Sequence, residues 1–475
     1  MRTDCTSDQL EFQGLGRRQV VGRFDAGQAS SDGGGLVLLR EVAEQTGWVE
    51  RFAGCFRDGR DAKRTEHTVA ELVAQRVLGI ALGYEDLNDH EWLRDDALLA
   101  LAAGKTDLTG EQRPRERDRG HALAGKSTLN RLELGRPGEP SRYHRIDHDP
   151  AAIESLLVDC GLEAQPEVPE RVVLDFDTTD DQLHGHQEGR FFHGYYRGYC
   201  YLPLYVFWGD RLLVAKLRTA NQDASAGAVE ELARIVGQIR RHWPKVEIWI
   251  RADSGFAREA LMAWCEANGV EFVLGLARNA RLQRAIGREL HEAKERCEAT
   301  GEAVRSFVEL PYRTKKTWSR ARRVVAKAEA LPGKANPRFV VTSLPAERYD
   351  ARTLYETLYC ARGDMENRIK EQQLDLFADR TSTATMRANQ LRLWFASMAY
   401  VLIAQLRRLG LEGTELARAQ AGTIRLRLFK IAALVRLSVR RIVISFSSVY
   451  PLQALFATAL ANLQRVSPQP NAPAH

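Results

Sequence analysis

The sequence predicts an α/β protein whose core is a mixed five-stranded sheet flanked by helices. Five short apolar and aromatic runs are typical of strands, and they lie at residues 171–177, 199–208, 211–218, 245–253 and 270–276. Gly209 and Asp210 join the second run to the third, which indicates a hairpin. Segments 225–243 and 258–267 read as helices that separate the later strands. This alternation predicts that some neighbouring strands are parallel.

Acidic residues end two of these predicted strands. Asp175 and Asp177 close the first run, and Asp253 closes the fourth. Adjacent parallel strands can bring their carboxyl ends together, where a third acid from a later helix could join them. Carboxylate oxygens suit Mg²⁺. Three acids with two divalent ions form a site for phosphoryl transfer, because one ion activates the attacking oxygen and the other stabilises the leaving oxygen.

A third acid is available on a helical segment at 352–377, which Gly363 weakens in its middle. Four polar residues lie near one side of this helix, at spacings of 3, 4 and 7 residues: Tyr359, Arg362, Glu366 and Gln373. Glu356 and Asp364 compete with Glu366, since helix-face spacing alone does not separate the three acids.

The chain is long enough for two to four domains at 475 residues, and its 44% apolar content supports a large core. The Pro-rich stretch 164–170 indicates a boundary near residue 165. The predicted parts are a mainly helical, DNA-binding N-terminal region, a first core segment, an insertion of a helix and a β-hairpin, a second core segment and a basic helical C-terminal region: 1–165, 166–278, 279–336, 337–384 and 385–475.

Two basic clusters favour a nucleic-acid partner, although a net charge of +6 is only mildly basic. Residues 311–338 hold nine Lys or Arg and one acid, and residues 385–441 hold eleven and two. Such runs are often merely solvated surfaces, but Trp318 and Tyr312 lie within the first. The seven cysteines include no CxxC pair and fit a reducing cytosol.

No membrane or secretion signal is expected. The amino terminus lacks an apolar segment of the secretory kind. The apolar run at 393–406 is too short to span a bilayer and predicts a buried helix.

Residues Gly120 to Ser127 match the G-x4-G-K-S pattern of a phosphate-binding loop, which raises the possibility of an ATPase. That pattern needs a buried strand before it, and the charged stretch 111–119 cannot form one. We therefore interpret the match as a coincidence. The helix expected at 126–135 could lie against DNA, or it could be an ordinary capped helix.

With these acids in place, the chain resembles the DDE transposases of bacterial insertion sequences, which have an RNase H-like catalytic core. Tyr359, Arg362 and Glu366 match the Y-x2-R-x3-E-x6-K signature, but Gln373 stands where its lysine is expected and Lys370 is the nearest substitute. The stretches DTTDDQLHG (177–185) and RADSGFAREAL (251–261) resemble the two Asp motifs, and the first favours Asp177 over Asp175. Three further stretches look like the thirteen-eighty family of insertion sequences: SSDGGGLVLLRE, QEGRFFHGYYRGYCYLPL and ARGDMENRIKEQQLDLFADRTS.

The resemblance implies cut-and-paste transposition that depends on two Mg²⁺ ions, or on Mn²⁺ in their place. Asp177, Asp253 and Glu366 would hold the metal and form the catalytic site. The residues that would bind DNA are Tyr359, Arg362, Lys370, Trp318, Lys315, Lys316 and Arg320. Trp318 could stack on an unpaired base, or it could be an exposed turn residue without that role.

The implied partners are the terminal inverted repeats of the transposon and target DNA, bound by a homodimer on paired ends. The implied location is the bacterial cytoplasm, at the nucleoid. A non-catalytic DNA-binding protein on a decayed transposase scaffold is the alternative.

Overall fold

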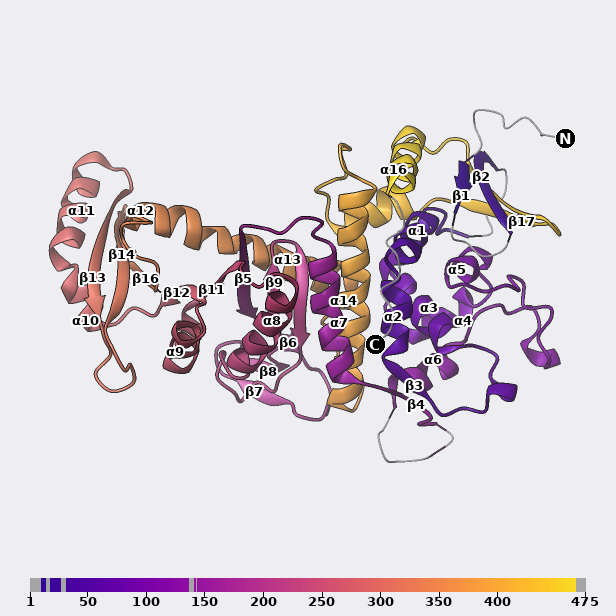
Figure 1. Cartoon of the computed structure of the whole chain (residues 1–475), viewed down its shortest axis with the longest axis horizontal. Coiled ribbons are helices and arrows are strands. Elements are labelled where there is room, and N and C mark those ends of the chain that lie inside the picture. The colour runs from indigo at the N-terminus through magenta and orange to yellow at the C-terminus, as the bar shows by residue number, and fades with distance from the viewer. Residues whose placement is uncertain (1–9, 14–17, 27–30, 136–140, 142, 467–475) are drawn as a thin grey trace. The chain divides into compact units, whose positions relative to one another are not determined.

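The structure is a computed structural model that describes residues 10–13, 18–26, 31–135, 141 and 143–466 (Figure 1). Two compact units make up the chain. Unit 1 comprises Met1–Cys160, His184–Glu188 and Lys370–His475, and unit 2 comprises Gly161–Leu183 and Gly189–Ile369. All of the predicted acids lie in unit 2. The division into five parts remains a prediction.

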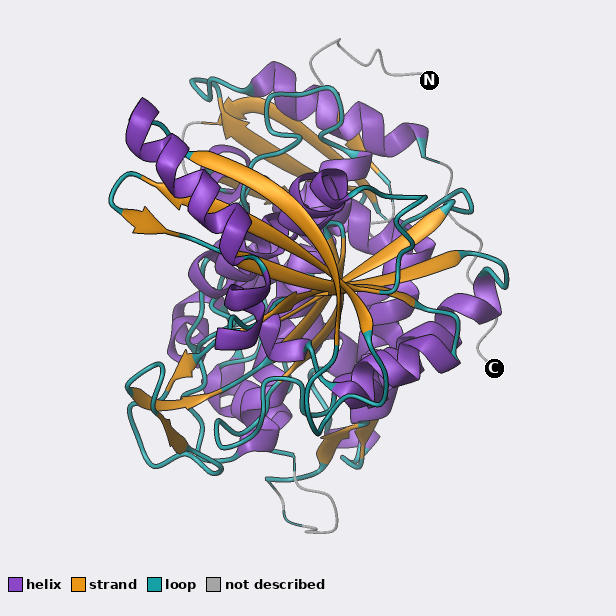
Figure 2. Ribbon diagram, turned by 90° about the vertical axis from the view of Figure 1, so that its left-hand side faces the viewer, coloured by secondary structure: helices purple, strands orange, loops and turns teal. Residues whose placement is uncertain are grey.

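Unit 2 is built on one large sheet. Its strands, in chain order, are β5 (Arg171–Thr178), β9 (Leu204–Trp208), β10 (Arg211–Lys216), β11 (Glu247–Ala252), β12 (Glu271–Leu276), β13 (Val304–Tyr312), β14 (Arg322–Leu331), β15 (Lys334–Ala335) and β16 (Arg338–Thr342). The spatial order is β10-β9-β5-β11-β12-β16-β14-β13, with β15 paired to β14. Figure 2 shows the marked twist of the strands. The predicted mixed α/β class is therefore confirmed.

The first five strands of that order are the predicted ones. Strand β5 pairs in parallel with β11, and β11 with β12, whereas β9 and β10 form the antiparallel hairpin expected around Gly209. The sheet continues beyond them, so the expected number of five strands is wrong: nine strands from the part of the chain that the structure describes belong to it. The reason is that β16 runs antiparallel to β12, and β14 pairs with β16. The hairpin β13–β14 thereby extends the core sheet.

Helices of unit 2 follow the strands in the predicted places. They are α8 (Ala228–His242), α9 (Glu259–Ala267), α10 (Ala280–Ala285), α11 (Gly287–Thr300) and α12 (Ala351–Thr353). Leu232, Ile235 and Ile239 of α8 are buried and have helical spacing. Short strands β6 (Asp181–Gln182), β7 (Phe191–His193) and β8 (Gly198–Tyr201) form a separate three-stranded sheet in the order β6-β8-β7.

Unit 1 is mainly helical. Its helices are α1 (Leu36–Thr46), α2 (Trp48–Gly54), α3 (Val69–Leu82), α4 (His90–Leu93), α5 (Ala97–Ala102), α6 (Lys126–Glu133), α14 (Met386–Leu409), α15 (Ala421–Ile424) and α16 (Gln453–Arg465), while α7 (Pro150–Glu163) and α13 (Gly363–Leu376) cross between the units. The buried helix predicted at 393–406 is confirmed as part of α14, which packs against α1 and α3. Its Phe395 ring lies 5.6 Å from that of Phe52.

Strands also occur in unit 1, in both of the terminal regions of the chain. Strands β1 (Leu10–Phe12), β2 (Gln19–Ala26), β17 (Ala433–Leu437) and β18 (Arg441–Ser447) form a sheet in the order β1-β2-β18-β17. Strand β2 pairs in parallel with β18, although more than 400 residues separate them (Val20 with Ile442, for example). A two-stranded sheet pairs β3 (Phe56–Asp58) with β4 (Ile146–His148). Local periodicity does not reveal such distant partners.

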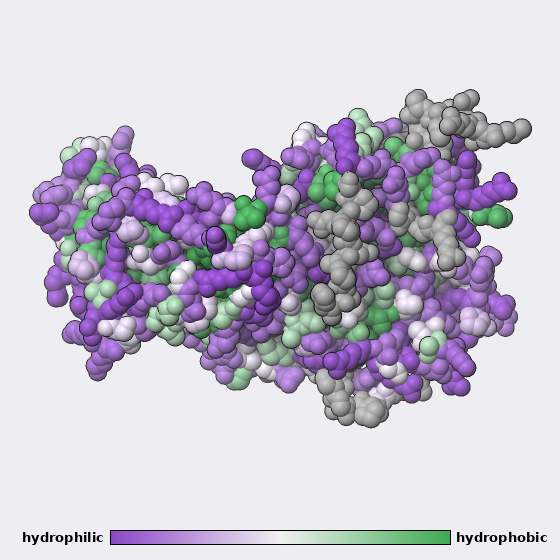
Figure 3. All heavy atoms as spheres, in the orientation of Figure 1, coloured by the Kyte–Doolittle hydropathy of each residue, from purple (hydrophilic) through white to green (hydrophobic). Residues whose placement is uncertain are grey.

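The described surface is mainly hydrophilic on the face shown in Figure 3, with apolar side chains in small groups. None of the helices in the described part of the chain combines the length and the apolar character that crossing a bilayer requires.

Candidate active site

Two of the predicted acids lie at neighbouring strand ends in unit 2. The parallel register of β5 and β11 pairs Phe176 with Ala252, so Asp177 and Asp253 each come one residue later. Thr178 N–H donates to Asp177 Oδ1 at 2.9 Å. Asp253 leaves the strand and caps the 3₁₀ turn Ser254–Phe256, where its Oδ1 accepts from Gly255 N–H at 2.9 Å. Both carboxylates are therefore fixed by the backbone around them.

The third acid comes from the helical segment that was predicted at 352–377. That segment begins as α12, continues as a π-helix over Leu354–Tyr359 and a 3₁₀ turn over Cys360–Arg362, and becomes α-helical again in α13. The predicted weakness at Gly363 thus lies where the 3₁₀ turn meets α13. Glu366 lies in the first turn of α13 and is half exposed.

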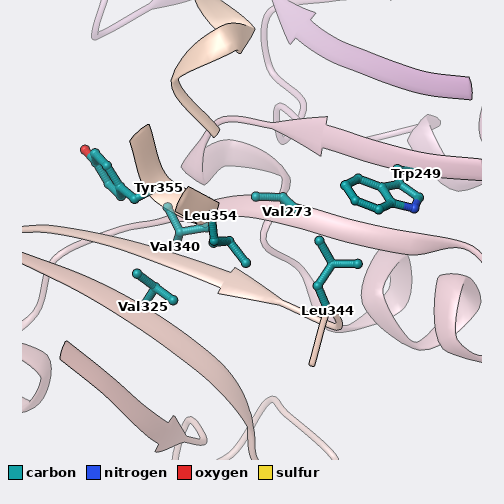
Figure 4. Close-up of a cluster of buried hydrophobic side chains, with 7 residues drawn as sticks. All are labelled: Trp249, Val273, Val325, Val340, Leu344, Leu354 and Tyr355. Atoms are coloured by element: carbon teal, nitrogen blue, oxygen red, sulfur yellow. The ribbon is translucent and has the colours of Figure 1, made fainter. Parts of the chain in front are cut away.

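Buried side chains hold the π-helical part of this segment against the sheet (Figure 4). The cluster contains residues from β11, β12, β14, β16, the bend after β16 and the π-helix: Trp249, Val273, Val325, Val340, Leu344, Leu354 and Tyr355. Leu358 and Tyr359 also pack against it. Burying aliphatic and aromatic side chains stabilises such a contact by about 1.5–3 kcal/mol for each fully buried residue. The packing fixes where the residues after Tyr359 lie relative to the strand ends.

Arg362 connects the acids of the strand and the helix. Its Nη1 donates to Asp177 Oδ2 at 2.9 Å, and its Nη2 donates to Glu366 Oε1 at 2.6 Å. Its guanidinium also interacts electrostatically with Asp253. The structure therefore brings Asp177, Asp253, Arg362 and Glu366 into one electrostatic group.

Burial is the largest cause that raises the pKa of Asp177 to about 6; the charges of Asp253 and Glu366 act in the same direction, while Arg362 and the Thr178 N–H oppose the change. Burial acts to lower the pKa of Arg362, but the surrounding carboxylates outweigh it and raise that pKa. Negative charge is thus crowded at this edge of the sheet, and the Arg362 guanidinium balances part of it.

Asp175, the other acid of the first strand, has a separate partner that sequence reasoning missed. Arg251 donates from Nε and Nη2 to the two Asp175 oxygens at 2.6 and 2.8 Å, and from Nη1 to the Leu358 carbonyl at 2.6 Å. The pair joins β5 and β11 to the π-helix. Arg251 lies two residues before Asp253 on a predicted strand, and this basic residue beside a predicted acid was the signal in the sequence for the missed partner.

Gly275 of β12 is a second residue that sequence reasoning missed. A Cβ at this position would lie 2.5 Å from the Tyr359 hydroxyl and 2.9 Å from Ser254 N. Only glycine admits the tyrosine so close to the strand, and a glycine within a strand is a known sign of close approach. Burial raises the pKa of Tyr359, so its hydroxyl stays protonated at neutral pH.

Among the described residues, no three of the His, Cys, Asp and Glu side chains form a group ready to hold a metal ion. The guanidinium of Arg362 is already bonded to two of the three acids. The donor chemistry nevertheless fits a hard divalent cation, because the oxygens are carboxylates and a cation, Arg362, already bridges two of them.

The competing acids of the helix differ from Glu366. Glu356 forms ion pairs with Arg305 and Arg352, both at 3.0 Å. Asp364 is exposed, and its charge helps to raise the pKa of Asp175 rather than that of Asp177. Lys370, the suggested substitute for the signature lysine, is exposed one helical turn after Glu366.

The expected exposure of Trp318 is wrong. Trp318 is 4% exposed. Its ring meets Tyr312 edge to face at 5.7 Å, and Arg322 lies 5.5 Å from its centre. The backbone N–H of Trp318 donates to Thr314 Oγ1 at 2.8 Å, within the turn that joins β13 to β14. In this conformation the ring cannot stack on a base.

Three basic residues of the same turn were also expected to bind DNA. Lys315 and Lys316 are exposed, and Arg320 is exposed but pairs with Glu266 at 2.8 Å. Their role in DNA binding remains a prediction.

The comparisons with known proteins identify the family of the chain. The model of the transposase DDE domain, group 1, matches residues 12–468. The chain therefore belongs to the DDE transposases of group 1, and it is a DNA transposase. The resemblance seen in the sequence is confirmed at this level.

No curated protein matches the chain. A cryo-EM structure of the piggyBac transposase synaptic complex with hairpin DNA matches 83% of this chain and 79% of that chain, at 11% identity and a TM-score of 0.40. A likeness this distant assigns no residues.

Proposed function

We propose that Asp177, Asp253 and Glu366 are the catalytic acids of this transposase and that together they hold divalent metal ions in an RNase H-like core. One observation carries the proposal: Arg362 bonds to Asp177 and Glu366 at once, beside the strand end that bears Asp253. Carboxylate oxygens favour Mg²⁺, with Mn²⁺ as an alternative. When bound, a pair of such ions activates an attacking oxygen and stabilises a leaving oxygen in phosphoryl transfer.

Each acid contributes differently to the site. Asp177 and Asp253 are held by rigid strand ends and by backbone N–H groups, so they set the position of the site. Glu366 stands on a helix and is more exposed. The two aspartates would stay in place while the glutamate side chain adjusts as substrate enters.

Arg362 would exchange its partners during the reaction. In the structure its guanidinium pairs with Asp177 and Glu366. Once other cations balance these acids, its guanidinium is free to bind a DNA phosphate, for which its planar pair of donors is suited. Tyr359, packed against Gly275, would place its protonated hydroxyl near the same phosphate.

The reaction would proceed in two phosphoryl transfers. Water attacks a phosphodiester at each end of the transposon, a P–O bond breaks and a 3′-hydroxyl is released. That hydroxyl then attacks a phosphodiester of the target DNA, so that a new P–O bond joins the transposon end to the target, a P–O bond of the target strand breaks and a 3′-hydroxyl of the target strand is released. Two ends must be processed together, so we propose that two copies of the chain act on paired ends, at the bacterial nucleoid.

The test is cleavage of a duplex that carries the transposon's own inverted repeat. Asp177→Asn, Asp253→Asn and Glu366→Gln should each reduce Mg²⁺-dependent cleavage to background and retain binding to the repeat, because they remove one carboxylate charge and keep the shape of the side chain. Gel electrophoresis of end-labelled DNA measures cleavage, and a mobility shift measures binding.

Asp364→Asn is the matched control, since it removes an exposed acid from the same helix and should retain cleavage. Cleavage by any of the three test variants would remove that residue from the site. A wild-type chain that binds the repeat and never cleaves it would favour the non-catalytic alternative.

A further inference from the structure

A cleft of about 860 Å³ in unit 1 is lined by an unusual number of arginines. Four stretches of the chain and one more residue form its walls: 60–67, 91–94, 113–118, 125–131 and Arg145. All belong to unit 1, and none belongs to the proposed catalytic site. The cleft also contains Gly125 and Ser127, two residues of the phosphate-loop match that the transposase function leaves unexplained.

The lining carries an excess of positive charge, because eight arginines face four acids. His67, buried at the cleft, adds no charge: burial and the nearby Lys105, Arg113 and Arg60 lower its pKa to about 3. The four acids do not neutralise the exposed arginines well. Asp61, Glu66 and Asp118 lie 3.6, 3.9 and 3.8 Å from Arg64, Arg115 and Arg117, respectively.

Three of these arginines can reach a large ligand. The side chains of Arg64, Arg115 and Arg117 are 84%, 58% and 76% exposed. Ion pairs this exposed and this long contribute little, about 0–1 kcal/mol, so an incoming anion displaces them at small cost. Arg145, a fourth arginine of the lining, is exposed as well. Several guanidiniums are thus available at once to an anion with repeated charges.

A nucleoside triphosphate fits this cleft poorly, despite the phosphate-loop match. The residues before Gly120 form a 3₁₀ turn, Glu116–Asp118, where such a loop needs a strand. Lys126 N–H, at the start of α6, donates to Glu91 Oε1 at 2.8 Å. A carboxylate therefore already lies where a bound phosphate would accept that hydrogen bond. The Lys126 ammonium in turn donates to Asn88 at 3.3 Å.

We propose that this cleft binds the phosphate backbone of double-stranded DNA, without reading its bases. Guanidinium groups pair with phosphate oxygens through two parallel hydrogen bonds, and spaced arginines match the regular spacing of phosphates along a strand. The inference rests on the chain being a DNA transposase and is independent of the metal site. It gives unit 1 a DNA-binding surface separate from the catalytic acids.

The test is the salt dependence of DNA binding by the full chain in EDTA, so that cleavage plays no part. The double variant Arg115→Gln/Arg117→Gln should bind a duplex of arbitrary sequence more weakly than the wild type. The slope of log affinity against log salt should become shallower by about 0.9 for each phosphate that the variant leaves unbound, or about 1.8 for two phosphates. Arg115→Lys/Arg117→Lys keeps the charge and should keep most of the slope.

Arg57→Gln/Arg465→Gln is the matched control, since both residues are exposed arginines of unit 1 outside the cleft. Unchanged thermal unfolding of each variant shows that it is folded. A slope for Arg115→Gln/Arg117→Gln equal to that of this control would overturn the proposal. Saturable binding of a fluorescent ATP analogue that Lys126→Ala abolishes would also overturn it, in favour of a nucleotide site.

Discussion

Asp175 and Asp177 lie two residues apart on β5, and each accepts hydrogen bonds from an arginine, yet the two interactions differ. Arg251 binds both oxygens of Asp175, and both side chains are largely buried. Arg362 donates one hydrogen bond to an oxygen of Asp177 and another to the half-exposed Glu366. The first interaction is complete and structural. The interaction of Arg362 with Asp177 leaves carboxylate lone pairs available to other ligands. Another cation could also take the place of Arg362, as a reaction site requires.

The largest effect is expected when the ion pair between Asp175 and Arg251 is broken. Asp175→Asn leaves the Arg251 guanidinium buried without its charge partner, so it should lower the free energy of unfolding by about 3–5 kcal/mol. Chemical denaturation of the metal-free protein at pH 8 measures this. Asp177→Asn under the same conditions should change it far less, because Arg362 keeps Glu366. Equal losses in the two variants would erase the distinction between the two interactions.

The next effect concerns the close approach that places Tyr359. Gly275→Ala puts a methyl group 2.5 Å from the Tyr359 hydroxyl, and such overpacking costs about 1–3 kcal/mol. We expect a matching loss of unfolding free energy and slower cleavage, since the helix that carries Arg362 and Glu366 must shift. Gly237→Ala is the control: it lies in α8 with no atom within 4 Å of the new methyl group and should be neutral or stabilising. Wild-type stability of Gly275→Ala would show that the helix position is adaptable.

A smaller effect is expected on how the free energy of unfolding depends on pH, through the carboxyl group of Asp177. The pKa of Asp177 is raised from 3.8 to about 6, so the folded state binds more protons than the unfolded state between these values. The free energy of unfolding contributed by this group therefore rises as pH falls through 6, by about 1 kcal/mol between pH 7 and pH 5. Denaturation of the metal-free protein at both pH values measures it, with Asp177→Asn as the reference. The same pH dependence in the variant would assign the proton to another group.

The smallest effect is expected at an ordinary surface pair on the same helical segment. Arg352 and Glu356 are four residues apart, like Arg362 and Glu366, but they lie away from the strand ends. Arg352→Gln should cost only about 0.3–0.5 kcal/mol and leave cleavage unchanged. Thermal unfolding and the cleavage assay check both expectations. A loss of cleavage would extend the site along the helix.

Local pattern was sufficient to predict the central strands, the helices between them and the segment that carries Glu366. Alternating apolar residues and the Gly209 turn define those elements within a few residues of the structure. The three proposed acids were predicted from the two Asp motifs and the Tyr-Arg-Glu signature. Distant pairing was not predictable: neither β14 against β16 nor β2 against β18 leaves a local signature.

The interaction partners of individual side chains were not predictable from the sequence either. Basic neighbours suggested that Trp318 is exposed, but its burial depends on Tyr312, six residues earlier along the chain, and on Arg322, which Glu259 and Glu266 hold in place. The link between Asp175 and Arg251 likewise depends on the register of two strands 76 positions apart. Composition carries no information about such interactions.

The pairing of β14 with β16 limits how the protein can be shortened. Residues 279–336 include the strand that covers the backbone of β16. A derivative without this segment would present β16 as a bare edge, with free N–H and C=O groups that invite pairing with another chain. Any relative that lacks the segment must protect that edge in some other way, or it will aggregate.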